Sequence, residues 1–207
     1  MGIKLIDLLF QKTKGRSKYF YNIMPIDNIP SVVKHGILSY NCAMRIQHSS
    51  IAMNEVQERR EKVIIPNGRP LHQYANLYFT YHNPMMYKRR KVANTICLLV
   101  IHPSIIETEN CILSDRNAAT NMVKFYTPYE GVNHIDFDLV FAQSWTDDDP
   151  YIASNKKAIK CAEILIPDCI PFNYIVGAIV LNEEVKDRLI ELGFSREILI
   201  RPKMFFN

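Results

Sequence analysis

The spacing of apolar residues along the chain predicts a set of short strands. Six runs are apolar or rich in β-prone side chains and have the length of a strand. These expected strands are residues 19–24, 74–81, 95–101, 162–166, 175–181 and 198–200. No apolar run approaches the roughly 20 residues that a membrane-spanning helix needs, so no membrane association is expected.

Helical spacing and turn residues between these runs predict helices. One helix is expected from the Asp27–Asn28 cap to His35, with Pro30 in its first turn and Gly36 as its stop. The other expected helices are residues 3–12, 115–125 and 183–192, a basic segment after Asn83–Pro84, and a piece near 52–62 within a long loop over 40–70.

The mixed order of these elements favours an α+β fold. It lacks the regular strand–helix alternation of a doubly wound sheet, and neither GxGxxG nor GxxxxGK[ST] occurs. We therefore expect a mixed, largely antiparallel sheet with surrounding helices. Without a linker or a repeat, residues 1–207 are interpreted as a single domain, with residues 1–18 as an N-terminal extension.

The net charge of +4 is unevenly distributed. Residues 1–101 contain 15 basic and 5 acidic residues, a net +10, whereas residues 102–207 contain 10 and 16, a net −6. A basic half suits an anionic partner such as a dinucleotide or a nucleic acid, although a solvated mixed surface explains it equally well.

The five cysteines are odd in number and form no CxxC pair. This pattern argues against a disulfide framework or a zinc cluster, so we expect no metal and a reducing cytoplasm. The N-terminus also lacks the basic start and the cleavage site of a signal peptide.

Glu163 is the first candidate for chemistry. It opens the apolar run Ala162–Pro167, where an unpaired carboxylate is costly to bury. It is therefore either a solvated residue at the end of a strand or a catalytic carboxylate that faces a cleft.

Four ordered segments give Glu163 a context. They are Tyr21–Val32 leading to Gly36–Ser39, then Ile51–Ala52 with Val56–Arg60, then Leu71–Tyr74 with Leu77–Phe79 and Asn83–Tyr87, and finally Ser114–Ala118 through Phe125–Tyr126, Ile135–Asp136 and Trp145 to Ala162–Pro167. In order and spacing the chain resembles, over roughly residues 19–185, the DarT toxins of DarT–DarG toxin–antitoxin systems.

The resemblance implies an ADP-ribosyltransferase fold that transfers ADP-ribose from NAD onto a base of single-stranded DNA. By position, Glu163 matches the catalytic glutamate of the family, at the end of an ADP-ribosylating turn-turn loop over about 122–163. Arg60 matches the arginine that acts on the acceptor base and contacts NAD. Arg59 is its neighbour, and residues 44–62 match a mobile NAD-binding element.

Other positions match where family members contact the dinucleotide, namely Asn22, Ile23, Met24, Ser31 and Ser39. The family pattern Tyr-His-Ile-Thr is replaced here by Tyr21-Asn22-Ile23-Met24. Asparagine donates and accepts hydrogen bonds as histidine does, with a shorter reach, so the substitution bears on how NAD is oriented.

Aromatic and basic side chains are further candidates for binding the acceptor. Tyr78, Phe79 and Tyr87 suit stacking or core packing, and Arg89 suits a phosphate contact or a solvated helix face. His72 and His134 are single histidines and are interpreted as structural. Asp115 and Asn117 suit helix capping as well as DNA contact.

Two alternatives to the DNA reaction remain at this point. One is an ADP-ribosyltransferase that acts on protein or RNA, and the other is a nucleic-acid-binding module that has lost catalysis. The resemblance also implies a neutralising partner, an antitoxin of the DarG type with a macrodomain that removes ADP-ribose from DNA.

Overall fold

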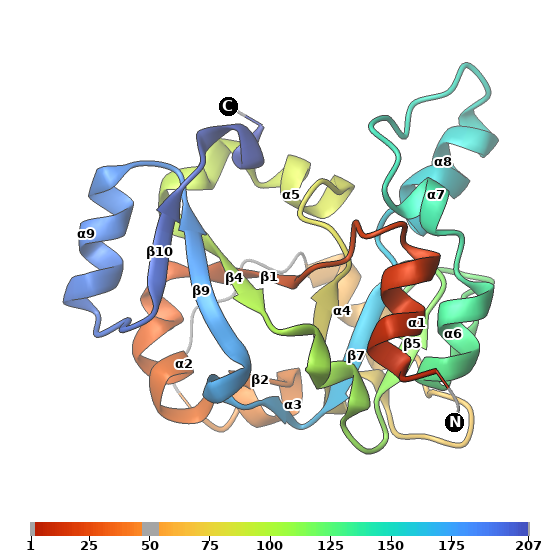
Figure 1. The fold of residues 1–207 in the computed structure, drawn as a ribbon, viewed down its shortest axis with the longest axis horizontal. Coiled ribbons are helices and arrows are strands. Elements are labelled where there is room, and N and C mark those ends of the chain that lie inside the picture. Colours follow the sequence, from red (N-terminus) through yellow and green to blue (C-terminus); the bar gives the residue numbers. More distant parts are fainter. Residues whose placement is uncertain (1–2, 47–53, 207) are drawn as a thin grey trace.

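A computed structural model of the chain describes residues 3–46 and 54–206. Its centre is an eight-stranded sheet of order β10-β9-β4-β1-β3-β7-β5-β6, in which β9 and β10 pair in parallel and every other pair is antiparallel (Figure 1). The strands are β1 (Phe20–Pro25), β3 (Tyr74–Tyr78), β4 (Ile96–Ile101), β5 (Ile112–Ser114), β6 (Phe125–Tyr126), β7 (Glu163–Pro167), β9 (Ile175–Val180) and β10 (Glu197–Ile200), with β2 (Ile37–Leu38) and β8 (Cys169–Ile170) in a separate pair. The expected mixed, largely antiparallel sheet is confirmed.

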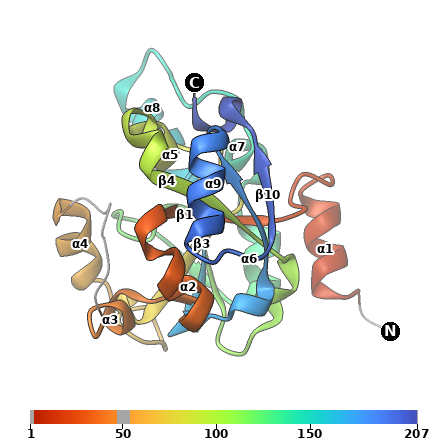
Figure 2. The same cartoon turned by 90° about the vertical axis from the view of Figure 1, so that its left-hand side faces the viewer.

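Nine α-helices in the described ranges surround the sheet. They are α1 (Leu5–Lys12), α2 (Ile29–His35), α3 (Tyr40–Ala43), α4 (Asn54–Glu61), α5 (Pro84–Lys88), α6 (Pro128–His134), α7 (Phe137–Val140), α8 (Pro150–Ile159) and α9 (Glu183–Glu191). Helices α2 and α9 lie at the β9–β10 end of the molecule, and α1 and α6 lie at the β5–β7 end (Figure 1). In the turned view, α1 and α4 are on opposite sides (Figure 2).

Strand β4 explains why the sheet is covered on both faces. Successive side chains of a strand point to opposite faces, and all six residues of β4 are buried. Cys97, Leu99 and Ile101 belong to the main core cluster. Ile96, Leu98 and Val100 belong to a second cluster with Met86 and Phe205. An uninterrupted apolar strand therefore marks a sheet with two buried faces.

The expected helix over 115–125 is wrong. Residues 115–124 form turns, and β6 follows them. Short polar side chains bond the nearby backbone instead, because the Asp115 carboxylate accepts from the Lys124 amide (2.9 Å) and the Asn117 amide oxygen accepts from the Ala119 amide (2.9 Å). Such bonds compete with a helix.

Two helices in the expected turn-turn region were not predicted. Helix α6 begins at a capping box of Thr127 and Glu130, and α8 begins at Asp149, whose carboxylate accepts from the Tyr151 amide (2.7 Å). Their polar sequences lack a long apolar stripe. Within residues 3–46 and 54–206, no helix has the length and apolar character to cross a bilayer.

Candidate active site

Glu163 lies at the centre of the site. It is the first residue of β7, where the register places it opposite Tyr78 of β3 and Ser114 of β5. Its side chain is fully buried. The backbone amide of Glu163 donates to Ser114 Oγ (3.1 Å), and Glu163 Oε1 accepts from the Ala118 amide (2.9 Å). The glutamate is therefore not a solvated residue at the end of a strand.

Arg60 supplies the counter-charge. Its Nη1 donates to Glu163 Oε1 (3.2 Å) and Oε2 (3.0 Å), and the Arg60 side chain is itself only 10% exposed. A buried ion pair of this kind is costly to desolvate and is poor evidence for stability alone. A pair held this way beside a cavity is more typical of a functional site.

A cavity of about 140 Å³ lies on one side of this pair. Strands β1 and β3 and helix α4 provide much of its wall. The described residues that line it are Asn22, Ile23, Met24, Ile37, Leu38, Tyr40, Gln57, Arg60, Leu71, His72, Tyr74, Ala75 and Asn76. We call it the donor cavity. Of the positions predicted to contact NAD, Asn22, Ile23, Met24 and Arg60 meet here.

Three buried polar atoms around the donor cavity have no hydrogen-bond partner among the described residues. They are Asn22 Oδ1, Gln57 Oε1 and His72 Nε2. Since buried polar atoms are nearly always paired in native proteins, three orphans in one small cavity indicate that a polar ligand completes them.

The orientations of these groups suit a ligand with hydroxyl or amide donors. Asn22 Nδ2 donates to the Asn76 carbonyl (3.0 Å), which leaves Asn22 Oδ1 as the unpaired atom. Burial, and then the charge of Arg60, lower the pKa of His72, so its ring is neutral near pH 7. Neither His72 nor Gln57 was predicted as a functional residue, because a single histidine and a polar helix residue carry no spacing signal.

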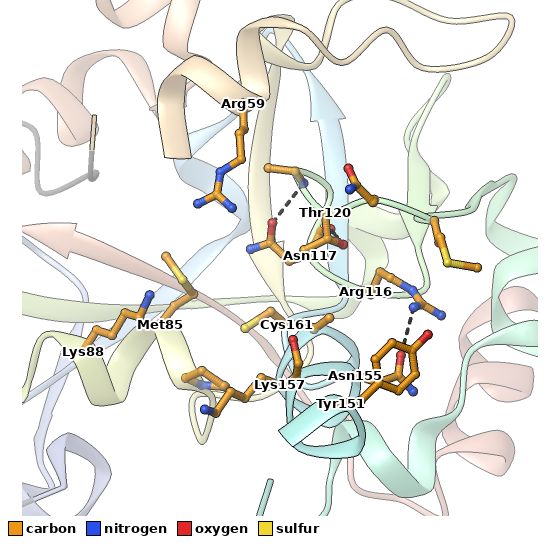
Figure 3. Close-up of a pocket in the computed structure, with 16 residues that line it drawn as sticks. Arg59, Met85, Lys88, Arg116, Asn117, Thr120, Tyr151, Asn155, Lys157 and Cys161 are labelled. Atoms are coloured by element: carbon orange, nitrogen blue, oxygen red, sulfur yellow. Dashed lines mark hydrogen bonds between the residues drawn. The ribbon is translucent and has the colours of Figure 1, made fainter. Parts of the chain in front are cut away.

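A second, larger pocket of about 500 Å³ is lined from α4, α5, α8 and the 115–122 loop (Figure 3). We call it the acceptor pocket. Cys161, which lies two residues before Glu163, lines this pocket. Asn117 and Ala119 also line it, and they flank Ala118, whose backbone amide donates to Glu163. Arg60 lines the donor cavity, whereas Glu163 is among the described lining residues of neither space, so the acceptor pocket approaches the pair through these neighbouring residues.

The acceptor pocket is positively charged. Arg59, Lys88, Arg116 and Lys157 line it, and there is no carboxylate among its described lining residues. Figure 3 shows these cations around the pocket, coming from α4, α5, the 115–122 loop and α8, with Arg116 directed toward Asn155 (3.1 Å). Tyr151 and Met122 also line the pocket and are 78% and 79% exposed, so apolar surface accompanies the charge.

Arg59 and Arg60 therefore line different spaces. They are consecutive residues of α4, and about 100° of helix rotation separates consecutive side chains. Arg60 points into the donor cavity, whereas Arg59 points into the acceptor pocket.

The comparisons with known proteins agree with this geometry. A family model described as ssDNA thymidine ADP-ribosyltransferase, DarT, matches residues 21–206. The chain belongs to the DarT family. The matched range includes Glu163, Arg60 and both pockets, while α1 lies outside it.

Curated relatives are similar along most of the chain. A DNA ADP-ribosyl transferase–DNA ADP-ribosyl glycohydrolase fusion protein of Thermosipho africanus is 28% identical over 92% of this chain, which spans half (50%) of the fusion protein's length. A DNA ADP-ribosyl transferase of Mycobacterium tuberculosis is 29% identical over 87% of this chain and 85% of its own length.

Solved structures of DarT proteins share the fold. Thermosipho africanus DarTG in complex with ADP-ribose superposes with a TM-score of 0.81 at 25% identity, covering 91% of this chain and 51% of that one. Thermus sp. 2.9 DarT in complex with ADP-ribosylated ssDNA gives 0.77 at 24% identity, covering 91% and 96%. The expected ADP-ribosyltransferase fold is confirmed.

The remaining predicted residues are placed away from the donor cavity. Ser31 lies on α2, and Ser39 caps α3 by accepting from the Cys42 amide (3.4 Å). Neither is among the residues described as lining either pocket, although Leu38 and Tyr40 beside Ser39 line the donor cavity. Residues 47–53 of the expected NAD-binding element lie outside the described residues.

Tyr78, Tyr87 and Arg89, which were predicted to bind the acceptor, are not among the described residues that line either pocket. Tyr78 is buried behind Glu163, and burial, then the charge of Glu163, raise its pKa. Tyr87 is 42% exposed on α5, with the Arg90 guanidinium 4.0 Å from its ring centroid. Arg89 donates to the Met85 carbonyl (2.9 Å), and burial lowers its pKa.

Proposed function

We propose that this chain transfers ADP-ribose from NAD onto a thymidine of single-stranded DNA, with Glu163 and Arg60 as the residues that carry the chemistry. The observation that carries the proposal is their buried ion pair, in which Arg60 lines the donor cavity and Glu163 lies two residues from Cys161 of the cationic acceptor pocket, in a chain of the DarT family. The catalytically lapsed module is disfavoured because this pair is intact.

The reaction exchanges one glycosidic bond for another. The bond between the nicotinamide nitrogen and C1 of its ribose breaks, and nicotinamide leaves with the electron pair. A thymine ring nitrogen then bonds to the same carbon and loses its proton. Charge develops on the sugar as a cation and on the base as an anion, and both need stabilisation in a site with little water.

Glu163 suits the cationic part of this transition state. A buried carboxylate beside the ribose stabilises an oxocarbenium-like charge more strongly than it would in water. The Ala118 amide and Arg60 fix its two oxygens, so little reorganisation is needed when the charge develops.

Arg60 suits the anionic part. A guanidinium is too basic to take a proton as an ordinary base, but it stabilises a base that has lost one. Because Nη1 alone contacts Glu163 in the described hydrogen bonds, the rest of the guanidinium fork would contact the substrate. Arg60 thus links the donor and the acceptor.

The two pockets suit the two substrates. The orphan atoms Asn22 Oδ1, Gln57 Oε1 and His72 Nε2 would accept hydrogen bonds from the ribose hydroxyls or the carboxamide of NAD. The cations of the acceptor pocket would follow DNA phosphates, and the exposed ring of Tyr151 offers a surface on which a base stacks.

The test is incubation of the protein with labelled NAD and a panel of single-stranded oligonucleotides that differ in thymidine content. We expect an ADP-ribose adduct, located on thymidine by mass spectrometry, and its loss in Glu163→Ala. Glu163→Gln is the matched variant, because it keeps the shape and removes only the charge.

Each result has a definite reading. Retained transfer in both variants would overturn the assignment of Glu163. Transfer to protein or RNA, with none to DNA, would overturn the acceptor. Loss of transfer in Glu163→Gln, with NAD still bound, supports the proposal.

The partner proposal is an antitoxin of the DarG type with a macrodomain that removes the adduct. It is supported by the Thermosipho africanus relative, whose name joins a DNA ADP-ribosyl transferase to a DNA ADP-ribosyl glycohydrolase. Co-expression of such a glycohydrolase with this chain is expected to restore growth and erase the thymidine adduct.

A further inference from the structure

The N-terminal extension lies outside the range that the family model matches. The family model begins at Tyr21, whereas the described chain begins with α1 and a basic connector. Residues 1–18 contain five basic residues and one acid. The function of this segment is therefore inferred from the residues that it contacts.

Helix α1 is anchored in the core. Leu5 and Leu9 are 4% and 1% exposed and belong to the main core cluster, and α1 packs against α6 (Figure 1). After the helix, Gly15 at φ +73° turns the chain back, with its amide donating to the Phe10 carbonyl (2.9 Å). This turn directs Lys14 and Arg16 toward α7.

Both cations converge on one carboxylate. Lys14 Nζ donates to Asp138 Oδ1 (3.0 Å) and Oδ2 (2.9 Å), and Arg16 Nη2 donates to Asp138 Oδ1 (2.6 Å). Hydrogen bonds from Lys14 and then Arg16 lower the pKa of Asp138. The Arg16 guanidinium also lies 4.9 Å from the ring centroid of Phe141.

A buried lysine also bonds the end of α7. Lys160, at the end of α8, is 2% exposed, and its Nζ donates to the carbonyls of Val140 (2.9 Å) and Ala142 (2.6 Å). Residue 160 adjoins Cys161, which lines the acceptor pocket. Contacts thus run from the extension through α7 to the acceptor pocket.

We infer that the N-terminal extension positions the acceptor side of the site. Lys14 and Arg16 hold α7 through Asp138, and α7 holds the end of α8, from which Asn155, Lys157 and Ala158 line the acceptor pocket. Lys14, Arg16 and Asp138 are positioning residues, and the inference rests on the proposed transfer to DNA.

Energetics decide which property should respond. Exposed ion pairs contribute little to global stability, so the melting temperature should hardly change. Orientation of reacting groups is more sensitive, since a misplacement of about 1 Å costs large factors in rate. The effect should appear in the use of DNA and not in the hydrolysis of NAD by water.

A competing explanation is direct contact between the basic connector and DNA phosphates. The two explanations predict opposite signs at Asp138. Removing this carboxylate frees two cations for DNA under direct contact, and so tightens binding. Under positioning it loosens α7 and weakens the use of DNA, although the protein becomes more positive.

The experiment compares Asp138→Asn with the Lys14→Gln/Arg16→Gln double variant. We expect both to raise the KM for a thymidine-containing oligonucleotide about 3- to 10-fold, and to leave NAD hydrolysis without DNA unchanged. Hydrogen–deuterium exchange of intact proteins should show faster exchange over residues 137–160. Lys186→Gln, which breaks the exposed Lys186–Glu183 pair (3.2 Å) on α9, is the control.

The outcomes separate the inference from the proposed function. Hydrogen–deuterium exchange over residues 137–160 does not depend on the acceptor. Faster exchange there supports the positioning of α7 by the N-terminal extension even if the parent protein modifies no DNA. Unchanged exchange and unchanged KM in both variants would overturn the inference. A lower KM in Asp138→Asn with a higher KM in the double variant would assign the cations to DNA instead.

Discussion

The donor cavity and the acceptor pocket differ in what builds them. The donor cavity is small, about 140 Å³, and its wall draws on β1 and β3, so the sheet register sets the position of Asn22, whereas Gln57 comes from α4 and His72 from the short helical turn over Leu71–Gln73. The acceptor pocket is about 500 Å³ and is lined from α4, α5, α8 and the 115–122 loop. The donor cavity thus draws much of its wall from strands, and the acceptor pocket is built from helices and a loop.

The two regions therefore differ in how readily their residues can be substituted. Loop and helix-end residues vary without disturbing a core, whereas a strand residue is fixed by its neighbours on both sides. Arg59 and Arg60 mark the boundary, since adjacent residues of α4 serve the two sides. Substitutions on either side of this boundary test whether the two halves are separable.

Arg60→Ala is expected to have the largest effect, because Arg60 lines the donor cavity and is also the ion-pair partner of Glu163. It removes the ion-pair partner of the buried Glu163 carboxylate, which destabilises a protein by about 3–5 kcal/mol in comparable cases. Both DNA transfer and NAD hydrolysis should fall by about 100-fold or more. Rate assays with and without oligonucleotide, at a temperature where circular dichroism shows a folded variant, test this.

The matched variant is Arg60→Lys. It keeps a positive charge but loses the planar fork, so it should preserve more of the fold than of the activity. NAD hydrolysis at the parental rate in Arg60→Ala would contradict a role for Arg60 on the donor side.

Asn22→Ala tests the donor side alone. It removes one of the three orphan acceptors, and a lost hydrogen bond of about 1.5 kcal/mol raises the KM for NAD about 10-fold. The KM for DNA should be unchanged. Initial rates over a range of NAD concentrations give both constants.

Asn22→His is the informative companion, because it restores the family residue. We expect its KM for NAD to be equal to or lower than that of the parent protein. An unchanged KM for NAD in Asn22→Ala would mean that Asn22 Oδ1 does not meet the dinucleotide.

Arg59→Gln tests the acceptor side alone, with a smaller effect. The loss of one phosphate contact should raise the KM for DNA about 3- to 10-fold and reduce the salt dependence of binding by about one charge. NAD hydrolysis should not change, since Arg59 lines only the acceptor pocket. Titrations at several salt concentrations measure the salt dependence of DNA binding. A raised KM for NAD would show that Arg59 also acts on the donor side.

The sequence predicted the strands better than the acceptor side, for a physical reason. Runs such as Thr95–Ile101 and Ala162–Ile166 are apolar because they are buried, so pattern and structure have one cause. The segment 115–125 has short polar side chains that either cap a helix or replace it, and only tertiary contacts such as Asn117 N to the Ala158 carbonyl (2.9 Å) decide.

The candidate site was predictable where a residue matched a motif. Glu163 and Arg60 were found this way and lie in contact, although 103 positions separate them in the chain. His72 and Gln57 were missed, because an unpaired buried atom is a property of three-dimensional packing. The charge asymmetry of the sequence revealed only part of the acceptor pocket, because Arg59 and Lys88 belong to the basic first half but Arg116 and Lys157 come from the acidic second half.

Lys160→Met should change stability in a pH-dependent way. Burial lowers the pKa of Lys160 to about 8 from 10.5, while the unfolded chain keeps the ordinary value. Between pH 8 and 10.5 the unfolded state therefore binds more protons, and the free energy of unfolding rises with pH from this group, by no more than about 1.4 kcal/mol per pH unit. Below pH 8 both states are protonated and the contribution is constant.

The difference between parent and variant isolates Lys160 from its neighbours. Burial raises the pKa of Cys161 from 9.0 to about 12, so above pH 9 the unfolded state loses this proton first and the thiol lowers the free energy of unfolding, opposite in sign to Lys160. Urea denaturation at pH 7, 8, 9 and 10 should give a parent-minus-variant difference that grows with pH above 8. A difference that stays flat would mean that water reaches the Lys160 amine, and that the contact between α7 and the end of α8 is looser than the hydrogen bonds to Val140 and Ala142 imply.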